Sequence, residues 1–174
     1  MINKYGKAGI LTAVLVMPAL FFLLLYSFTE NHYQLPYFIP TVDAEGKVIM
    51  KGKDTVFYKV PDADDLQIKV VSFLAKDDAK ALQQLKRVEK MIGERVKFIH
   101  VDDEDAANIA VSKYKVSPLK KTNSSETIPY ARQFILIDKE GYIRGFYDGG
   151  DVEDVDRLMA EIKVLIDIYQ KKEK

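Results

Sequence analysis

Apolar and polar residues follow two different spacings along this chain, and the spacing changes at regular intervals. Short runs in which nearly every residue is apolar, such as QIKVVSFL (67–74), predict strands that are covered on both faces. Stretches in which apolar residues recur every three or four positions predict amphipathic helices. The expected strands are 47–50, 56–60, 67–74, 96–101, 132–137 and 142–147, and the expected helices are about 78–92, 102–114 and the segment after residue 151.

Polar residues between these runs fit the expected turns and helix ends. Asp77 or Asp78 can cap the first helix, and Gly93 suits its end. Residues 51–54 and 138–141 are typical of hairpin turns, and 116–129 is expected to be a loop. The expected apolar faces are Leu82, Leu85, Val88, Met91 and Ile92 on the first helix, and Val152, Val155, Leu158, Ile162, Leu165, Ile166 and Tyr169 on the last.

The order of elements from residue 67 onward is β-α-β-α-β-β-α. A βαβ crossover requires parallel strands, and the closing hairpin adds an antiparallel pair. This is the order of a thioredoxin-like domain. We therefore expect an α/β, thioredoxin-like fold.

A separate apolar run lies near the N-terminus. Residues 8–29 (AGILTAVLVMPALFFLLLYSFT) carry no charge. As a helix they would extend about 33 Å, enough to cross a hydrocarbon core of roughly 30 Å. Lys4 and Lys7 precede the run and Glu30 follows it, which places the N-terminus in the cytoplasm. We expect an N-terminal transmembrane helix in the cell inner membrane; a cleaved signal peptide is the alternative.

The expected domain organisation follows from these segments. Residues 1–29 would form a cytoplasmic tip and a single-pass anchor, and 30–46 an extended stalk with aromatic residues suited to the membrane interface. Residues 47–174 would form the thioredoxin-like domain in the periplasm.

The composition of the chain excludes several classes of active site and argues against one class of partner. Basic and acidic residues balance at 26 each, and no long basic stretch with aromatic residues is present, so we expect no nucleic-acid partner. The chain has no cysteine, which excludes disulfides, thiol catalysis and thiolate metal sites.

Several stretches resemble one known family. FILIDKEGYIRGFYDGGDVEDVDRLMAEIKVLI (134–166) is similar to the hairpin "LVD-x-x-G-x-I-R-G-x-Y-D-G" and the following helix of bacterial Sco/SenC proteins. VKFIHVDDED (96–105) resembles the family's second strand and its "V-D-P-E" turn, with Asp103 at the proline position, and LPYF (35–38) matches a stalk motif. The resemblance implies a membrane-anchored thioredoxin fold and a role in cytochrome oxidase assembly.

The family's copper site is not reproduced. It consists of a C-x-x-x-C-P motif after the first core strand and a histidine before the third, and soft thiolates with an imidazole suit copper. The corresponding positions here fall near Asp78, Leu82 and Tyr130. We therefore expect no metal, no cofactor and no catalytic residue at this corner.

Other candidates have competing explanations. Asp77 and Asp78 could bind a hard cation, but a helix cap is favoured because Lys76 and Lys80 are adjacent. Tyr130 can fill the histidine's space or contact a partner together with Arg132, Asp77 and Asp78. The acidic cluster 102–105 lacks the spacing of a calcium loop. Of the two histidines, His32 lies in the stalk, and His100 would need Asp102 or Asp103 as co-ligands.

These observations predict a binding or scaffold module rather than an enzyme, with a respiratory oxidase or its assembly factors as the expected partner. One alternative is an active copper chaperone or thiol-disulfide-type factor with a non-standard site, for which Met50, Met91 and Met159 are the candidate soft ligands in the outer domain. Another is a metal site made of carboxylates or histidine.

Overall fold

The computed structural model describes residues 14–25, 35–61, 63, 66–74, 78–102, 105–117, 119–120 and 127–172. The chain divides into two compact units, Met1–Gln34 and Leu35–Lys174. In the first unit, residues 14–25 are helical, and the two ends of the expected anchor lie outside the described residues. No helix within the described ranges has both the length and the apolar character that crossing a membrane requires.

The second unit is built on a four-stranded sheet in the order β4-β3-β7-β8. The central strand β3 pairs in parallel with β4 and antiparallel with β7, which in turn pairs antiparallel with β8. The strands are β3 (Ile68–Ser72), β4 (Val96–His100), β7 (Gln133–Ile137) and β8 (Ile143–Asp148).

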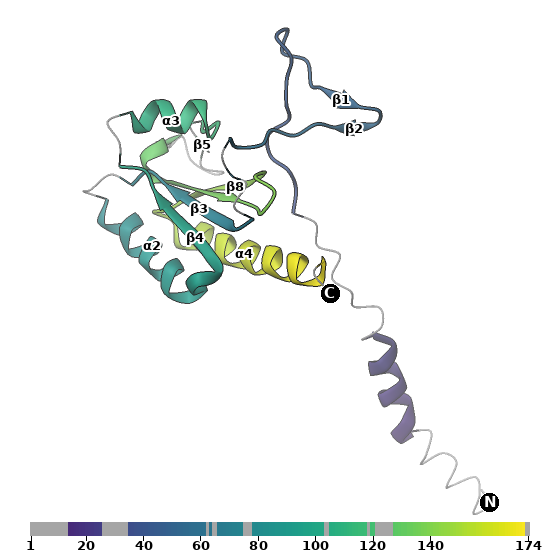
Figure 1. The fold of residues 1–174 in the computed structure, drawn as a ribbon. Helices are drawn as coiled ribbons and strands as arrows, with labels where there is room; N and C mark the ends of the chain where they lie inside the picture. The colour runs from purple at the N-terminus through teal and green to yellow at the C-terminus, as the bar shows by residue number, and fades with distance from the viewer. Residues whose placement is uncertain are drawn as a thin grey trace, which may run out of the picture. The chain divides into compact units, whose positions relative to one another are not determined.

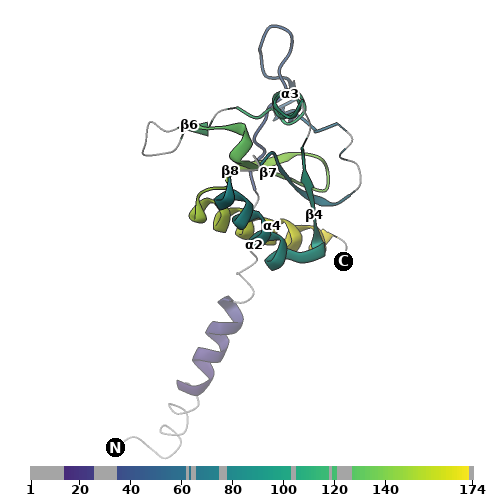
Figure 2. The same ribbon diagram turned by 90° about the vertical axis from the view of Figure 1, so that its left-hand side faces the viewer.

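Helices cover both faces of this sheet (Figures 1 and 2). Helices α2 (Ala79–Ile92) and α4 (Val152–Lys172) lie on one face, and α3 (Ala106–Ser112) lies on the other. Two 3-10 turns, η1 (Gly93–Arg95) and η2 (Tyr130–Arg132), lead into β4 and β7. A parallel βαβ unit followed by an antiparallel hairpin and a final helix is the thioredoxin-like arrangement, so the expected α/β order is confirmed.

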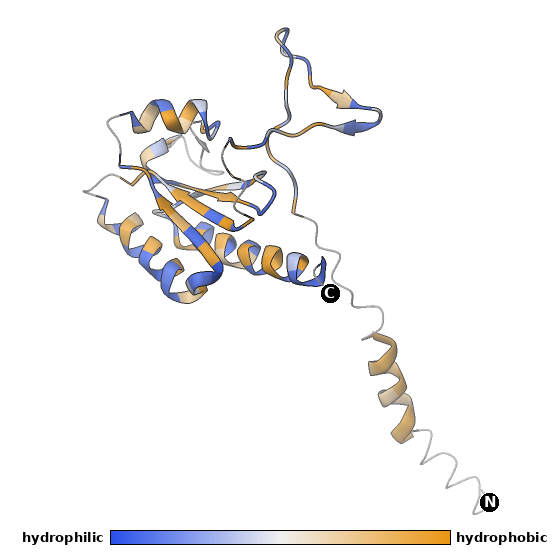
Figure 3. Cartoon of the chain, viewed as in Figure 1, coloured by the Kyte–Doolittle hydropathy of each residue, from blue (hydrophilic) through white to orange (hydrophobic). Residues whose placement is uncertain are grey.

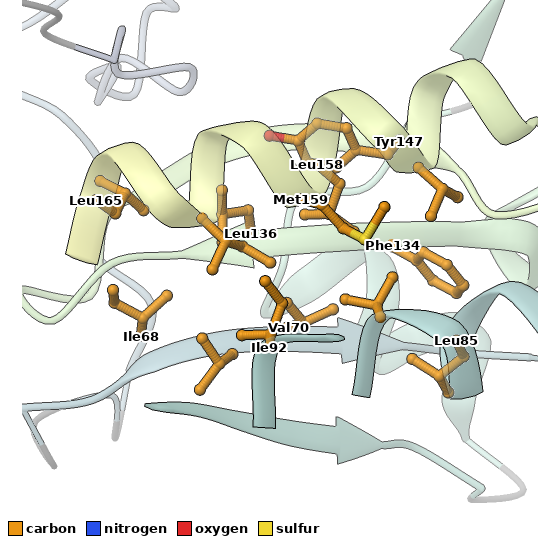
Figure 4. Packing of buried hydrophobic residues seen from close by; sticks show 14 of the residues in the cluster. Ile68, Val70, Leu85, Ile92, Phe134, Leu136, Tyr147, Leu158, Met159 and Leu165 are labelled. Atoms are coloured by element: carbon orange, nitrogen blue, oxygen red, sulfur yellow. The ribbon is translucent and has the colours of Figure 1, made fainter. Parts of the chain in front are cut away.

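Apolar side chains form one cluster on each side of the sheet. The larger cluster lies between the sheet and helices α2 and α4, where Val70, Leu136 and Tyr147 meet Leu158 and Leu165 (Figure 4). The smaller lies between the sheet and α3, and joins Val71, Phe73, Ile135 and Ala110. Because β3 and β7 contribute to both clusters, every residue of these two strands is buried.

Three details of the expected elements were wrong. Strand β4 is the edge of the sheet, so only Val96 of its five residues is buried, although a buried strand was expected. Leu82, Met91 and Val152 are exposed, because the helix faces that contact the sheet are narrower than the apolar spacing predicted. The expected loop 116–129 contains a short ladder formed by β5 (Leu119–Lys120) and β6 (Thr127–Ile128).

The segment before the sheet also differs from the expected stalk. Residues 35–41 lie against the domain, where Leu35 packs on the larger core cluster and the Phe38 amide donates to the Ile143 carbonyl at 3.2 Å. A hairpin is present within 47–60, formed by β1 (Met50–Lys51) and β2 (Asp54–Thr55). Its strands are shorter than the expected 47–50 and 56–60, and the second lies before the expected one. Residues 35–60 therefore form an arm that begins on β8, and the part of the stalk from 30 to 34 lies outside the described residues.

Candidate functional site

The candidate site is the corner where β3 leads into α2. Phe73 and Leu74 follow β3 and are buried, and Asp77 lies in a stretch outside the described residues. Asp78 occupies the N-cap position of α2, where its Oδ1 accepts a hydrogen bond from the Ala81 amide at 3.0 Å. This confirms that Asp78 caps the helix, and its carboxylate satisfies a backbone donor that helix geometry leaves unpaired.

Two side chains near this corner, one aliphatic and one aromatic, are accessible to solvent. Leu82, one turn into α2, is 39% exposed, and Tyr130, in η2, is 38% exposed. The Tyr130 ring packs edge-to-face on Phe73 with centroids 6.3 Å apart, so the structure brings Tyr130 to the end of β3 as expected. Tyr130 therefore fills space beside Phe73, and part of its ring stays accessible to solvent.

The Arg132 guanidinium is engaged within the domain. Its Nε and Nη2 donate to Oδ1 and Oδ2 of Asp148, both at 2.7 Å. Asp148 is buried, and its Oδ1 also accepts from the Gly150 amide at 2.9 Å. A bidentate pair of this kind fixes orientation, so Arg132 holds η2 against the end of β8.

Gln133 was not expected as a functional residue, yet it secures the same segment. Its Nε2 donates to the carbonyls of Ser117 and Ile128, at 3.1 and 3.0 Å. Its Oε1 is buried and has no hydrogen-bond partner in the described part of the chain. A buried amide oxygen of this kind is suited to an ordered water. The sequence offered one signal for this role: Gln133 is a polar residue at the start of an otherwise apolar strand.

His100 pairs with a strand neighbour. Its Nδ1 lies 3.3 Å from the Oγ of Ser72, which is opposite it in the β3–β4 register. His100 itself is exposed at the sheet edge, whereas Ser72 is buried. The structure therefore places the His100 ring beside a hydroxyl, and Asp103, one of the two carboxylates that a metal site here would need, lies outside the described residues.

The hairpin that carries most of the sequence resemblance has a structural role. Asp138 Oδ1 accepts from the amides of Glu140 and Tyr142, both at 2.9 Å, and closes the β7–β8 turn. Its Oδ2 accepts from Arg144 Nε at 2.6 Å. Arg144 in turn donates through Nη1 to the Leu35 carbonyl at 2.6 Å. Burial alone would lower the pKa of Arg144, but the charge and hydrogen bond of Asp138 raise it overall.

The second half of the same motif closes the other end of the hairpin. The buried Tyr147 hydroxyl donates to Glu161 Oε2 at 2.7 Å, and the Arg157 guanidinium lies 4.7 Å above the Tyr147 ring. Burial and then the bond to Glu161 raise the Tyr147 pKa far above its usual value. A Cβ at Gly145 would lie 2.3 Å from the Tyr147 hydroxyl, which explains the glycine two residues before this tyrosine.

The donors at this corner do not fit copper. A carboxylate committed to a helix cap, an aliphatic side chain and a phenol occupy the three corresponding positions, and none is a soft ligand. Among the described residues, no group of three or more histidine, aspartate and glutamate side chains is placed to hold a metal ion. Asp103 and Glu104 of the acidic cluster, and His32, lie outside those residues.

The methionines expected as alternative ligands lie on separate elements. Met50 is exposed in the arm, where its Sδ accepts from Thr55 Oγ1 at 3.5 Å. Met91 is on the exposed side of α2, and Met159 is buried in the larger core cluster on α4. This distribution does not favour a shared methionine site.

Comparison with known proteins gives similarity at the level of structure. No family model matches the chain, and no curated protein matches it. A SCO1/SenC family lipoprotein from Bacillus anthracis str. Ames is similar over 78% of this chain and 96% of its own, with 15% identity and a TM-score of 0.45. BsSco, a member of the Sco family of cytochrome c oxidase assembly proteins, is similar over 78% and 94%, with 11% identity and a TM-score of 0.41. Both structures are described as Sco-family proteins.

Proposed function

We propose that this protein is a membrane-anchored, extracytoplasmic thioredoxin-like domain that acts by binding a partner and performs no copper or thiol chemistry. The observation that carries the proposal is the set of side chains at the corner after β3, none of which is a thiolate. The Asp78 carboxylate is bonded to the Ala81 amide at 3.0 Å, and the chain has no cysteine. The chemistry expected of a redox or Cu(I) site therefore lacks its ligands.

The proposed contact surface is the pair of accessible side chains near this corner, Leu82 and Tyr130. Aromatic side chains are enriched at the centres of protein interfaces. Tyr130 is supported by Phe73 and by the segment that Arg132 and Gln133 hold in place. A ring on a fixed support loses little conformational freedom on binding.

The partner we propose is a respiratory oxidase or one of its assembly factors. This part of the proposal rests on the sequence resemblance of residues 134–166 and 96–105 to Sco/SenC proteins. A strain that lacks the protein should contain less active oxidase. Wild type should restore the activity, and Tyr130→Ala should restore less of it at equal protein level. Lys163→Ala, on the exposed side of α4, is the matched control. Full rescue by Tyr130→Ala would contradict the proposed contact.

Anchoring through residues 8–29 supports the extracytoplasmic location. The run has no charge, and Lys4 and Lys7 precede it. A periplasm-active reporter fused to the C-terminus should be active, and the protein should stay in the membrane fraction after a high-salt wash. Recovery of a shortened protein in the soluble fraction would indicate cleavage instead.

A further inference from the structure

The arm formed by residues 35–60 carries an apolar face whose outer part is exposed in the described structure. Strand pairing defines this face, because residues opposite each other and residues two apart point to the same side. Met50 lies opposite Thr55, Val42 opposite Val48, and Pro40 opposite Phe57. One side of the arm therefore presents Pro40, Val42, Val48, Met50, Thr55 and Phe57.

The outer part of this side faces solvent, whereas Phe57 at its base stacks on Tyr37. The other side is only partly used within the domain, since Ile49 there is 39% exposed. Val42, Val48 and Met50 are 52%, 45% and 52% exposed. Ile39 and Tyr58, on the opposite side, pack against the cluster under α3. Figure 3 shows apolar residues along the arm, which projects away from the sheet. Contiguous exposed apolar residues are typical of an interaction surface.

The connection to the expected anchor limits how far the base of the arm can lie from the bilayer. Leu35 is fixed to the domain through its carbonyl, which accepts from Arg144 Nη1 at 2.6 Å. The expected anchor ends at Thr29, and a fully extended chain from Thr29 to Leu35 reaches at most about 20 Å. The arm begins at Leu35, so the part of the domain from which it extends must stay close to the membrane.

The charges beside the apolar face favour lipid over a charged protein. Asp43, Glu45 and Asp54 balance Lys47, Lys51 and Lys53 within residues 42–55. Lys59, at the base of the arm, lies over the Tyr142 ring. At the base of the arm, the exposed Tyr37 ring stacks on Phe57 with centroids 4.8 Å apart. Tyrosine rings are enriched at membrane–water interfaces.

We propose that the face made by Val42, Val48 and Met50 inserts into the interface of the lipid bilayer and sets the orientation of the domain on the membrane. This inference rests on the anchor of the proposed function. Because the neighbouring charges balance, the contact requires no anionic lipid.

The absence of native cysteine allows a direct test with single labels on the full chain. Val48→Cys, Lys51→Cys and Lys80→Cys each receive an environment-sensitive fluorophore, and the proteins are reconstituted into phosphatidylcholine vesicles with or without spin-labelled acyl chains. Lys51 is next to Met50 and points to the other side of the arm, and Lys80 is exposed at the start of α2. Flotation reports separately whether the chain is in the vesicles.

The label at Val48 should be quenched at least about twofold more than the label at Lys80, because interfacial segments sit roughly 5–10 Å into the boundary between headgroups and acyl chains. Lys51 should give an intermediate value. Equal quenching at Val48 and Lys80 in vesicles that contain the protein would overturn the inference and leave the anchor intact. Self-quenching at Val48 that depends on protein density, without quenching by lipid, would overturn it in favour of contact between two copies. Failure to float would overturn the anchor and this inference with it.

Discussion

Arg144 and Asp138 form a buried ion pair in which Nε lies 2.6 Å from Oδ2 and the two side chains are 9% and 0% exposed. The pair joins two parts of the domain, the β7–β8 hairpin and the start of the N-terminal arm. Asp138 closes the β7–β8 turn, Arg144 holds the Leu35 carbonyl, and the Arg144 guanidinium lies 3.9 Å above the Tyr37 ring. The residues that carry the sequence resemblance thus connect the N-terminal arm to the sheet.

Asp138→Ala should lower the free energy of unfolding by about 3–5 kcal/mol, because it leaves a buried guanidinium without its counter-ion. Asp138→Asn should lose less, since its side-chain oxygen still accepts from the turn amides. Urea unfolding of the full chain in detergent at neutral pH measures both values. Asp156→Ala is the matched control: it breaks an ion pair with Arg87 of the same 2.6 Å length whose side chains are 39% and 53% exposed. Such pairs contribute about 0–1 kcal/mol, so equal losses for Asp138→Ala and Asp156→Ala would show that the buried pair has no special role.

Asp78→Ala should lower stability by about 1 kcal/mol, because the Ala81 amide loses its acceptor. For a domain of this size that is a fall of a few degrees in melting temperature. Asp78→Asn should recover most of the loss. Melts with and without divalent cations and a chelator provide the control. A wild-type melting temperature that rises strongly with one cation, and fails to rise in Asp78→Asn, would identify a metal site in place of a cap.

Stability should fall at alkaline pH in a way that depends on Tyr147. Burial and then the bond to Glu161 raise its pKa in the folded state. An unfolded tyrosine ionises near pH 10, so this stabilisation is fully present below pH 10 and decreases above it, by about 1.4 kcal/mol per pH unit for one such group. Tyr147→Phe should therefore be less stable at neutral pH but show a shallower decline above pH 10. Unfolding free energies measured from pH 9 to 11.5 test this, and parallel curves for the two proteins would contradict it.

Hydropathy spacing predicted the elements of the domain because each strand and helix has a strong local pattern. The expected strand 67–74 contains β3 (Ile68–Ser72), every residue of which is buried. The expected helix 78–92 is α2, with its cap at Asp78 and its end at Gly93. Burial of the second strand could not be predicted in the same way. VKFIHV is as apolar as a central strand, but β4 is at the edge of the sheet, and strand order depends on contacts distant in sequence.

The site shows the same division. Capping by Asp78 follows from local sequence, and the position of Tyr130 beside Phe73 follows from the fold. The hydrogen bonds from Arg132 to Asp148 could not be predicted, because Asp148 lies on β8, 16 residues further along the chain. The contact of Leu35 with Arg144 could not be predicted either. It joins residues 109 positions apart in the sequence and makes the end of the expected stalk part of the domain.

Competition for Cu(I) tests the central claim most directly. The purified full chain is loaded with Cu(I) and titrated with a chelator, beside the variant Asp78→Cys/Leu82→Cys/Tyr130→His, which rebuilds the ligands at the three corresponding positions. We predict that wild type releases all of its copper to the chelator, whereas the rebuilt variant retains an equimolar amount. A wild-type complex that keeps stoichiometric Cu(I) against the chelator would contradict the account and establish a copper site of a different kind.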